Sequence, residues 1–344
     1  MKKWTGAFQV AAVYVGTVIG AGFATGKEIV EFFSQYGIAG FIGILLVGYL
    51  FIFLGSKIMT ISIEIRAKSY EEFNEYLFGK KLAKIMNIFT MLMLIGVCAV
   101  MLSGAEALFV EQLHLSKSIG SIITITLALL VMAMGVRGIF AVNTFVVPML
   151  IIFNITLLIV TLTNDYFIQN FWLTSDKQFS WRVIMSAFSY SAFNLTLAQA
   201  VLVPIATEVN DKEIVKRGGI LGGIFLTVIL AASHVTLLSL PELMIFEIPM
   251  AVIVKSTISS IYVVYLFIIY GEIFTSLIGN LYGLEKQIKK YISVKSVFIY
   301  LGIIMIVYGI SRVEYGKLLS LLYPAFGYIS LIFLVLLWLK PVKK

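Results

Sequence analysis

Long apolar stretches alternate with short polar segments along the whole chain. Most of these stretches have the length of about 20 residues that an α-helix needs to cross the hydrocarbon core of a bilayer. The pattern therefore predicts an all-α polytopic membrane protein with about ten transmembrane helices. The predicted spans cover residues 7–35, 38–62, 85–111, 118–136, 141–163, 183–207, 218–240, 258–282, 296–311 and 318–339.

Composition points the same way. Of the 344 residues, 60% are apolar and 13% are charged, whereas soluble domains carry about 25% charged residues. We therefore expect neither a soluble enzyme nor catalytic residues. The net charge of +8 does not indicate nucleic-acid binding, because the lysines lie between apolar runs, and membrane lipid is the expected partner.

The start, Met-Lys-Lys-Trp, lacks a nearby cleavage site, so we expect no cleaved signal peptide.

Basic residues predict the orientation of the chain. If the N-terminus is cytoplasmic, most of the basic residues lie in the inner segments and few in the outer ones, as the positive-inside rule requires. The inner ones are Lys2, Lys3, Lys57, Arg66, Lys68, Lys80, Lys81, Lys84, Arg137, Lys212, Lys216, Arg217, Lys286, Lys289, Lys290, Lys295, Lys340, Lys343 and Lys344, and the outer ones are Lys117, Lys177, Arg182, Arg312 and Lys317. We expect a bacterial cell-membrane protein with both termini in the cytoplasm.

Corresponding features recur at a nearly constant offset. A glycine cluster around Gly20 and a serine cluster around Ser189 lie 169 residues apart, and the third and eighth predicted spans begin 173 residues apart. Five spans followed by five more place the second set in the opposite orientation, since an odd number of crossings inverts the topology. The spacing predicts one membrane domain made of two inverted five-helix repeats, residues 1–165 and 166–344.

The first span contains four glycines, Gly16, Gly20, Gly22 and Gly26. Each interior glycine weakens a helix by about 1 kcal/mol relative to alanine, so we expect the helix to break here. Unwound backbone inside a membrane is tolerated where it lines a cavity or a ligand site. The alternative is close packing of two helices at these small residues.

The sixth span mixes polar and aromatic residues where a lipid-facing helix would carry leucine and isoleucine. Serine hydroxyls can compete for backbone hydrogen bonds, so we expect a second break here. The alternative is a polar seam between helices. Two interrupted helices in corresponding positions of two halves mark the central site of many transporters. The candidate substrate-binding residues of this span are Ser189, Tyr190, Ser191, Phe193 and Asn194.

Other chemistry is excluded or weak. The single cysteine, Cys98, excludes an intrachain disulfide and a cysteine-based metal cluster, and only two histidines occur. The glycine run of the first span fits neither a dinucleotide fingerprint nor a phosphate loop. We expect no cofactor. Cys98 and Met101 of the third span either face a substrate or pack in the core.

Ten spans with a glycine-rich first and a polar sixth resemble the LeuT-fold transporters of the amino acid–polyamine–organocation superfamily. Within that group, the run GAGFATGKE from Gly20 to Glu28 resembles the bacterial YkvI-type membrane proteins. The resemblance implies a substrate carboxylate held at Gly20, Ala21 and Gly22 by the backbone amides of the latter two residues.

The resemblance also implies a sodium site. Its ligands would be the carbonyl groups of Gly16 and Ile19 in the first span, the Thr275–Ser276 pair of the eighth span, and the carbonyl of Glu272. Sodium-independent relatives often carry a lysine in the fifth span, and residues 141–163 contain none. The Glu272 side chain could itself enhance cation binding, carry a proton, or reach water at the inner side.

Besides Glu272, two further charged residues, Lys27 and Glu106, are candidates for gating or proton transfer. Lys27, with Glu28 and Glu31 beside it, lies roughly where relatives place outer-gate charges, although simple interfacial solvation is the alternative. Glu106 could line the entry path or pair with Lys27 or Lys255.

These expectations combine into a sodium-coupled symporter of an amino acid or similar small organic solute. The alternatives are proton coupling through Glu272 or Glu106, and a ligand-sensing receptor on a transporter scaffold. Substrate identity and oligomeric state stay open from sequence.

Overall fold

The computed structural model describes residues 2–163, 180–240, 243, 248–313 and 315–341, and these contain helices and no β-strand. The first half holds α1 (Lys2–Val18), α2 (Ala21–Ala24), α3 (Lys27–Phe32), η1 (Ser34–Tyr36), α4 (Ala39–Leu50), the π-helical η2 (Phe51–Gly55), α5 (Ser56–Ile65), α6 (Tyr70–Glu111), α7 (Lys117–Ala133) and α8 (Val136–Leu162). The second half holds α10 (Trp181–Val209), α11 (Lys212–Leu237), α12 (Pro249–Thr257), η3 (Ser259–Ile261), α13 (Tyr262–Ile288), α14 (Ser296–Ile310) and α15 (Tyr315–Leu339).

Each predicted span coincides with a helix or a run of helices. Among the described residues, seven of these helices are long and apolar enough to cross a membrane, and α7 and α14 are shorter apolar helices. Large apolar side chains such as Ile85, Phe145 and Met305 are exposed on the surface, which suits contact with lipid. The exact number of spans and the inverted repeat remain predictions.

Polar capping residues set the start of several helices. The Asp211 carboxylate accepts the N–H groups of Glu213 and Ile214 at 2.9 and 3.1 Å, and α11 begins there. Ser116 caps α7 in the same manner. Gly79, with φ of 73°, bends α6 between its first turns and its long apolar part, so the two parts run in different directions.

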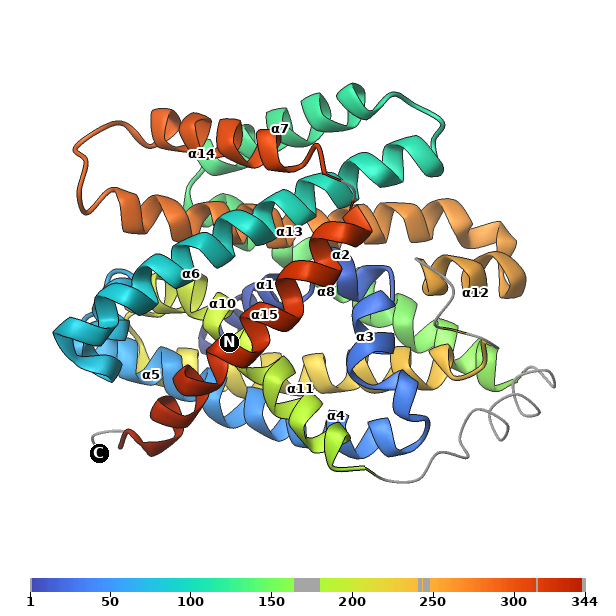
Figure 1. Ribbon diagram of the computed structural model, residues 1–344, viewed down its shortest axis with the longest axis horizontal. Helices are drawn as coiled ribbons and strands as arrows, with labels where there is room; N and C mark the ends of the chain where they lie inside the picture. Colours follow the sequence, from blue (N-terminus) through green and yellow to red (C-terminus); the bar gives the residue numbers. More distant parts are fainter. Residues whose placement is uncertain (1, 164–179, 241–242, 244–247, 314, 342–344) are drawn as a thin grey trace.

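The first and sixth predicted spans form the centre of the bundle (Figure 1). Every residue from Val10 to Gly26 is buried, and so is every residue from Ser189 to Ala206. Helix α1 packs against α8, α10, α11 and α13, while α10 also packs against α15 and α4. A helix buried on all sides lies in the core rather than against lipid, so these two spans are placed to line a central site.

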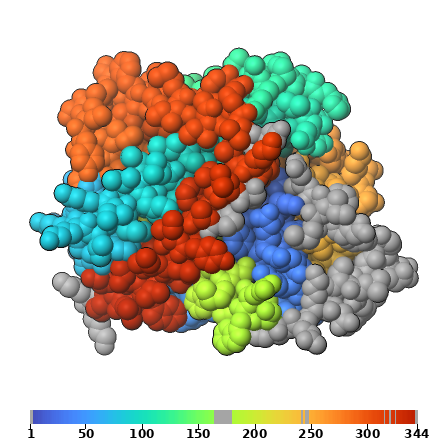
Figure 2. Space-filling model, viewed as in Figure 1, coloured from blue at the N-terminus to red at the C-terminus, as the bar shows by residue number. Residues whose placement is uncertain are grey.

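The remaining helices surround this pair. Helices α7 and α14 pack together along the upper edge of the view, and α15 runs diagonally across the front of the molecule (Figure 2), where it packs against α6 and α10. Helices α6 and α13 pack against each other beneath them (Figure 1).

The predicted break in the first span is present. Helix α1 ends at Val18, Gly20 is extended with φ of −131° and ψ of −167°, and the four-residue α2 follows. A second interruption lies at Gly26, whose φ of 83° is a left-handed conformation that favours glycine. The span therefore consists of the 17-residue α1 and the short helices α2 and α3, and it ends in η1.

The predicted break in the sixth span is wrong, because α10 is one continuous helix from Trp181 to Val209. Residues 181–209 contain no glycine. The polar side chains that suggested a break instead bond to carbonyl groups one turn earlier, Ser191 to Ala187 and Asn194 to Tyr190. Such bonds lie along the helix and leave its own ladder in place.

Candidate functional site

The break in the first span leaves carbonyl groups without donors. The last helical bond of α1 runs from the Ile19 N–H to the Val15 carbonyl at 2.9 Å, and the next one runs from the Ala24 N–H to the Gly20 carbonyl at 2.9 Å. Within the described residues, no hydrogen bond ends on a carbonyl between Gly16 and Ile19. Free carbonyl groups in a buried core are costly unless a ligand or an ion satisfies them.

Helix α13 brings side-chain oxygens to the same break. A Cβ added to Gly16 would lie 3.2 Å from Thr275 Cβ, and one added to Gly20 would lie 3.4 Å from Ser276 Oγ. The Thr275 hydroxyl donates to the Glu272 carbonyl at 2.9 Å. The structure thus brings the two glycines of the first span next to the Thr275–Ser276 pair.

Asn143 of α8 lies at the same place. A Cβ added to Gly16 would overlap Asn143 Oδ1. The Asn143 amide donates to the Ile139 carbonyl at 2.9 Å, whereas its Oδ1 has no hydrogen-bond partner within the described part of the chain. Asn143 is a functional candidate that the sequence interpretation missed, although a polar residue inside an apolar span was a signal for it.

The Glu272 side chain points away from this pair. It lines a cavity of about 10 Å³ with Asn154, Ser233 and Tyr265, a space near the minimum for one water molecule. The Ser233 hydroxyl donates to Asn154 Oδ1 at 2.7 Å. Glu272 is 3% exposed, and neither its Oε2 nor the Tyr265 hydroxyl has a hydrogen-bond partner among the described residues.

The amide expected to bind a substrate carboxylate has a partner in the protein. The Ala21 N–H donates to the Met101 sulfur at 3.2 Å. Met101 also lies against Gly20, where an added Cβ would be 3.1 Å from the sulfur. Met101 therefore covers the start of α2, and it is buried in the core.

The candidate residues on α10 face in different directions. Ser189 and Phe193 face α15, because a Cβ added to Gly327 would overlap Ser189 Oγ and the Phe193 ring lies 4.7 Å from the Tyr323 ring. Ser191 bonds to its own helix. Ser189 and Phe193 therefore lie in the contact between α10 and α15, while the Ser191 hydroxyl is satisfied within α10.

Tyr190 and Asn194 instead face the first span. Both lie beside the carboxyl group of Glu28 on α3. Glu28 is 2% exposed, and its Oε1 has no hydrogen-bond partner within the described residues. From the sequence, Glu28 was interpreted as one of the charges near an outer gate. In the structure its carboxyl group is buried more deeply than a charge at the surface would be.

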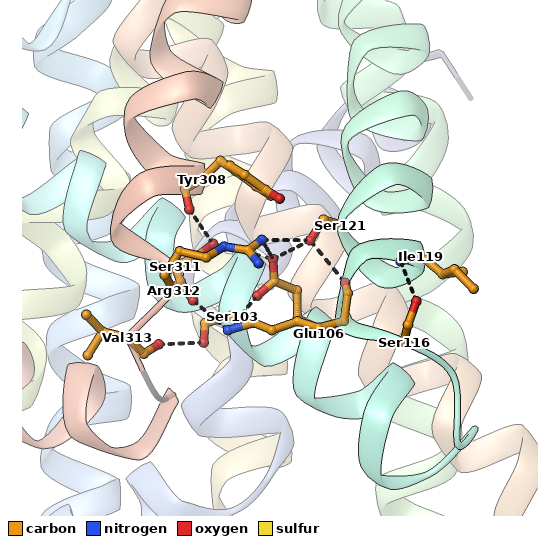
Figure 3. A network of polar contacts seen from close by, with 10 residues as sticks. Ser103, Glu106, Ser116, Ile119, Ser121, Tyr308, Ser311, Arg312 and Val313 are labelled. Carbon is orange, nitrogen blue, oxygen red and sulfur yellow. Dashed lines mark hydrogen bonds and ion pairs between the residues drawn. The ribbon is translucent and has the colours of Figure 1, made fainter.

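Glu106 belongs to a separate network (Figure 3). It is fully buried and forms ion pairs with Lys117 and Arg312, each at 3.2 Å. The hydroxyls of Ser121 and Ser311 donate to the same carboxylate. Glu106 therefore pairs with neither Lys27 nor Lys255, and its network joins α6, α7 and the end of α14.

The junction between α2 and α3 is covered by α12. The Met250 N–H donates to the Thr25 carbonyl at 3.1 Å, and a Cβ added to Gly26 would lie 3.4 Å from Met250 Cβ. Lys27 follows directly, half-buried, with its N–H directed at the Thr25 hydroxyl at 3.4 Å. The predicted gate position thus lies where α12 contacts the first span.

Comparison with solved structures identifies the fold. A substrate-bound outward-open Na⁺-coupled sialic acid symporter has a TM-score of 0.70 and 11% identity, covering 96% of this chain and 78% of that one. MhsT in complex with L-phenylalanine has a TM-score of 0.66, 16% identity and coverage of 96% and 88%. A manganese transporter of Eremococcus coleocola has a TM-score of 0.59, 14% identity and coverage of 96% and 76%. These likenesses define the chain as a LeuT-fold membrane protein.

Sequence comparison identifies the family. The chain is 50% identical over 342 residues to the membrane protein YkvI of Bacillus subtilis (strain 168), covering 98% of this chain and 97% of YkvI. It is 25% identical over 342 residues to YyaD of the same organism, with 98% of each chain covered. No family model matches. The chain belongs to the YkvI family of membrane proteins.

Proposed function

We propose that this chain is a secondary active transporter of the cell membrane that takes up an amino acid or similar small organic solute, driven by inward sodium. The observation that carries the proposal is the group of free carbonyls from Gly16 to Ile19, buried beside the hydroxyls of Thr275 and Ser276. Carbonyl and hydroxyl oxygens are hard ligands that suit an alkali cation. Two proteins with this fold add support: one is a Na⁺-coupled symporter, and the other forms a complex with L-phenylalanine.

In this proposal the ion holds the broken first span against α13. The solute lies at the depth of the ion site. On one side of it are Gly20, Ala21 and Gly22, and on the other is the face of α10 that carries Tyr190 and Asn194. Both termini of the chain lie in the cytoplasm. Sodium binding orders the break, and the solute then binds to a first span whose geometry is already set, which couples the two affinities.

The melting temperature of the purified protein in detergent tests the ion site. Sodium chloride should raise it relative to potassium chloride, since a ligand at 100 times its dissociation constant stabilises by about 2.7 kcal/mol. The T275A/S276A double variant should lose this difference. The control is the T156A/T163A variant, which removes two threonine hydroxyls that bond to carbonyl groups of α8. This variant should keep the difference between sodium and potassium. A full sodium shift in T275A/S276A would refute the assignment.

One observation favours proton coupling as a second candidate. The buried Glu272 carboxyl lines a small cavity with one oxygen unpartnered in the described structure. Glu106 is less suited to release and bind a proton, because two cations neutralise it. Uptake driven by a pH gradient, indifferent to sodium and lost in E272Q, would favour this candidate over sodium symport.

A further inference from the structure

Glu28 is a buried carboxylate that the ion site does not use. It is 2% exposed, and it forms no ion pair with any described residue. Burying a carboxylate costs free energy unless a positive charge or hydrogen bonds compensate. Glu106, equally buried, has two cationic partners. Unlike Glu106, Glu28 therefore has no cation among the described residues to compensate its charge, and the polar groups beside it are Tyr190 and Asn194.

Two tyrosines lie beside this carboxyl group. The hydroxyl of Tyr190 is directed at it, and the centroid of the Tyr190 ring lies 5.2 Å from that of Phe32 and 5.0 Å from that of Phe33. Tyr323 of α15 also lies near the Glu28 carboxyl group. Aromatic faces attract cations, and a tyrosine hydroxyl can accept a hydrogen bond while it donates another.

The site is poorly equipped to bind an anion. The Ala21 N–H, the first amide of α2, is directed at the Met101 sulfur. Helix α2 has only four residues, so few peptide dipoles add up at its start. An ammonium group has N–H donors and no acceptor, and it therefore complements a carboxylate, a hydroxyl oxygen and aromatic faces.

We propose that Glu28 binds the ammonium group of the transported solute. The substrates are then organic amines, or amino acids recognised through the amino group rather than through the carboxylate. This inference rests on the proposed transport function, which it deepens by naming the substrate class.

The wild-type protein provides the first test, which needs no variant. Its melting temperature is measured with two matched series, L-leucine, isopentylamine and 4-methylpentanoate, and L-phenylalanine, phenethylamine and 3-phenylpropanoate. Within each series the side group is constant and only the charged groups differ. The amine of at least one series should stabilise the protein, and neither acid should. Stabilisation by an acid but not by its amine, or by none of the amines, would overturn the inference.

Two variants locate the interaction. E28Q keeps the shape of the side chain and removes its charge, and the affinity for the stabilising amine should fall about 10- to 100-fold. E213Q, the same substitution at an exposed glutamate of α11, should bind as wild type. Y190F keeps the carboxylate and should bind about 2- to 10-fold more weakly, which gives a measurement if E28Q does not fold. Wild-type affinity in E28Q would refute the role of Glu28.

Flux in proteoliposomes separates this inference from the proposed function. An amine that binds through Glu28 but is not moved would refute transport and leave the recognition intact. An acid that is moved by both wild type and E28Q would refute the recognition and leave transport intact. If E28Q still binds the amine but loses uptake driven by a pH gradient, Glu28 carries a proton, and the inference is overturned.

Discussion

At the scale of single residues, the contact between Gly16 and Asn143 determines which side chains the first span can accommodate at position 16. Asn143 Oδ1 occupies the space that a side chain at Gly16 would need. Forcing an extra methyl group into a packed core costs about 1–3 kcal/mol. The glycine is therefore needed for a close approach at this position, in addition to any role of its carbonyl.

We expect G16A to lower the free energy of unfolding by about 1–3 kcal/mol, measured by thermal or denaturant unfolding in detergent. The matched control is G302A in α14, where nothing lies within 4 Å of an added Cβ. That substitution should change stability by less than about 1 kcal/mol, in the stabilising direction, because alanine is the better helix former. Equal stability of G16A and wild type would show that Asn143 moves aside freely.

The sequence allowed the proximity of residues in a motif to be predicted, but not the direction in which each side chain of a buried helix points; the role of the motif as a sodium site stays a prediction. Thr275 and Ser276 lie beside Gly16 and Gly20, as the resemblance implied. On α10, however, Ser189 and Phe193 face α15 while Tyr190 faces the first span. A helix that is buried on all sides has no polar face to reveal its orientation. In the same way, sequence does not reveal whether a buried carboxylate has a cationic or hydrogen-bonding partner, because this depends on how the helices pack.

At the scale of elements, the Glu106 network joins three parts of the bundle. Its cations are partly exposed, with 36% exposure for Lys117 and 41% for Arg312, whereas the Glu106 side chain is at 0%. A single remaining cation can still neutralise the carboxylate. Loss of both leaves an uncompensated buried charge, which is the costly case.

We expect the K117A/R312A double variant to lose about 3–5 kcal/mol of stability, more than the sum of the two single variants. Adding E106Q to the double variant should restore much of the loss, because the buried charge is then absent. The exposed pair of Lys3 and Glu213 gives a control, since K3A should cost less than about 1 kcal/mol. Additive single effects would contradict the shared neutralisation of Glu106. All are measured by unfolding in detergent.

Element prediction from sequence depended on which signal was used. Glycines placed the break in the first span, because their effect acts on the backbone itself. Serine and asparagine did not break α10, because Ser191 and Asn194 found acceptors within the same helix. Polar composition alone therefore did not distinguish an interrupted helix from a continuous one.

At the scale of the whole molecule, the two ends of the central helices differ. Helix α12 covers the junction at Thr25 and Gly26 at the predicted outer end. At the predicted inner end, a cavity of about 490 Å³ lies beside Thr207 and Glu208 of α10 and Lys286 of α13. In the proposed transport function, alternating access requires the α12 contact to open during the cycle.

We expect a disulfide between G26C and M250C, in a C98A background, to stop uptake of the most stabilising solute. An added Cβ at Gly26 lies 3.4 Å from Met250 Cβ, near the separation of about 3.5–4.5 Å found in disulfides. Reduction should restore uptake to the level of the unoxidised variant, which already carries the strain of a cysteine at this left-handed position. Undiminished uptake after complete oxidation would show that this contact does not open, and M250C alone controls for the oxidant.

The two-repeat organisation was predicted from spacing and stays a prediction. Helix α6 packs on α7 as α13 packs on α14, and α1 packs on α8 as α10 packs on α15. These are the pairs that two halves with the same order of five helices produce. The residue-level relation between the halves was not visible in sequence, since packing of apolar helices constrains volume more than identity.

The difference between the broken first span and the continuous α10 has a consequence for how members of this family diverge. In the proposed arrangement the ion is held largely by main-chain oxygens, which most substitutions leave unchanged, while the solute meets side chains on α10 and α3. Point mutations at positions such as Tyr190 can therefore change the accepted solute and leave the energy source of uptake unaltered. One ancestral protein can in this way give rise to paralogues that transport different solutes with the same driving ion.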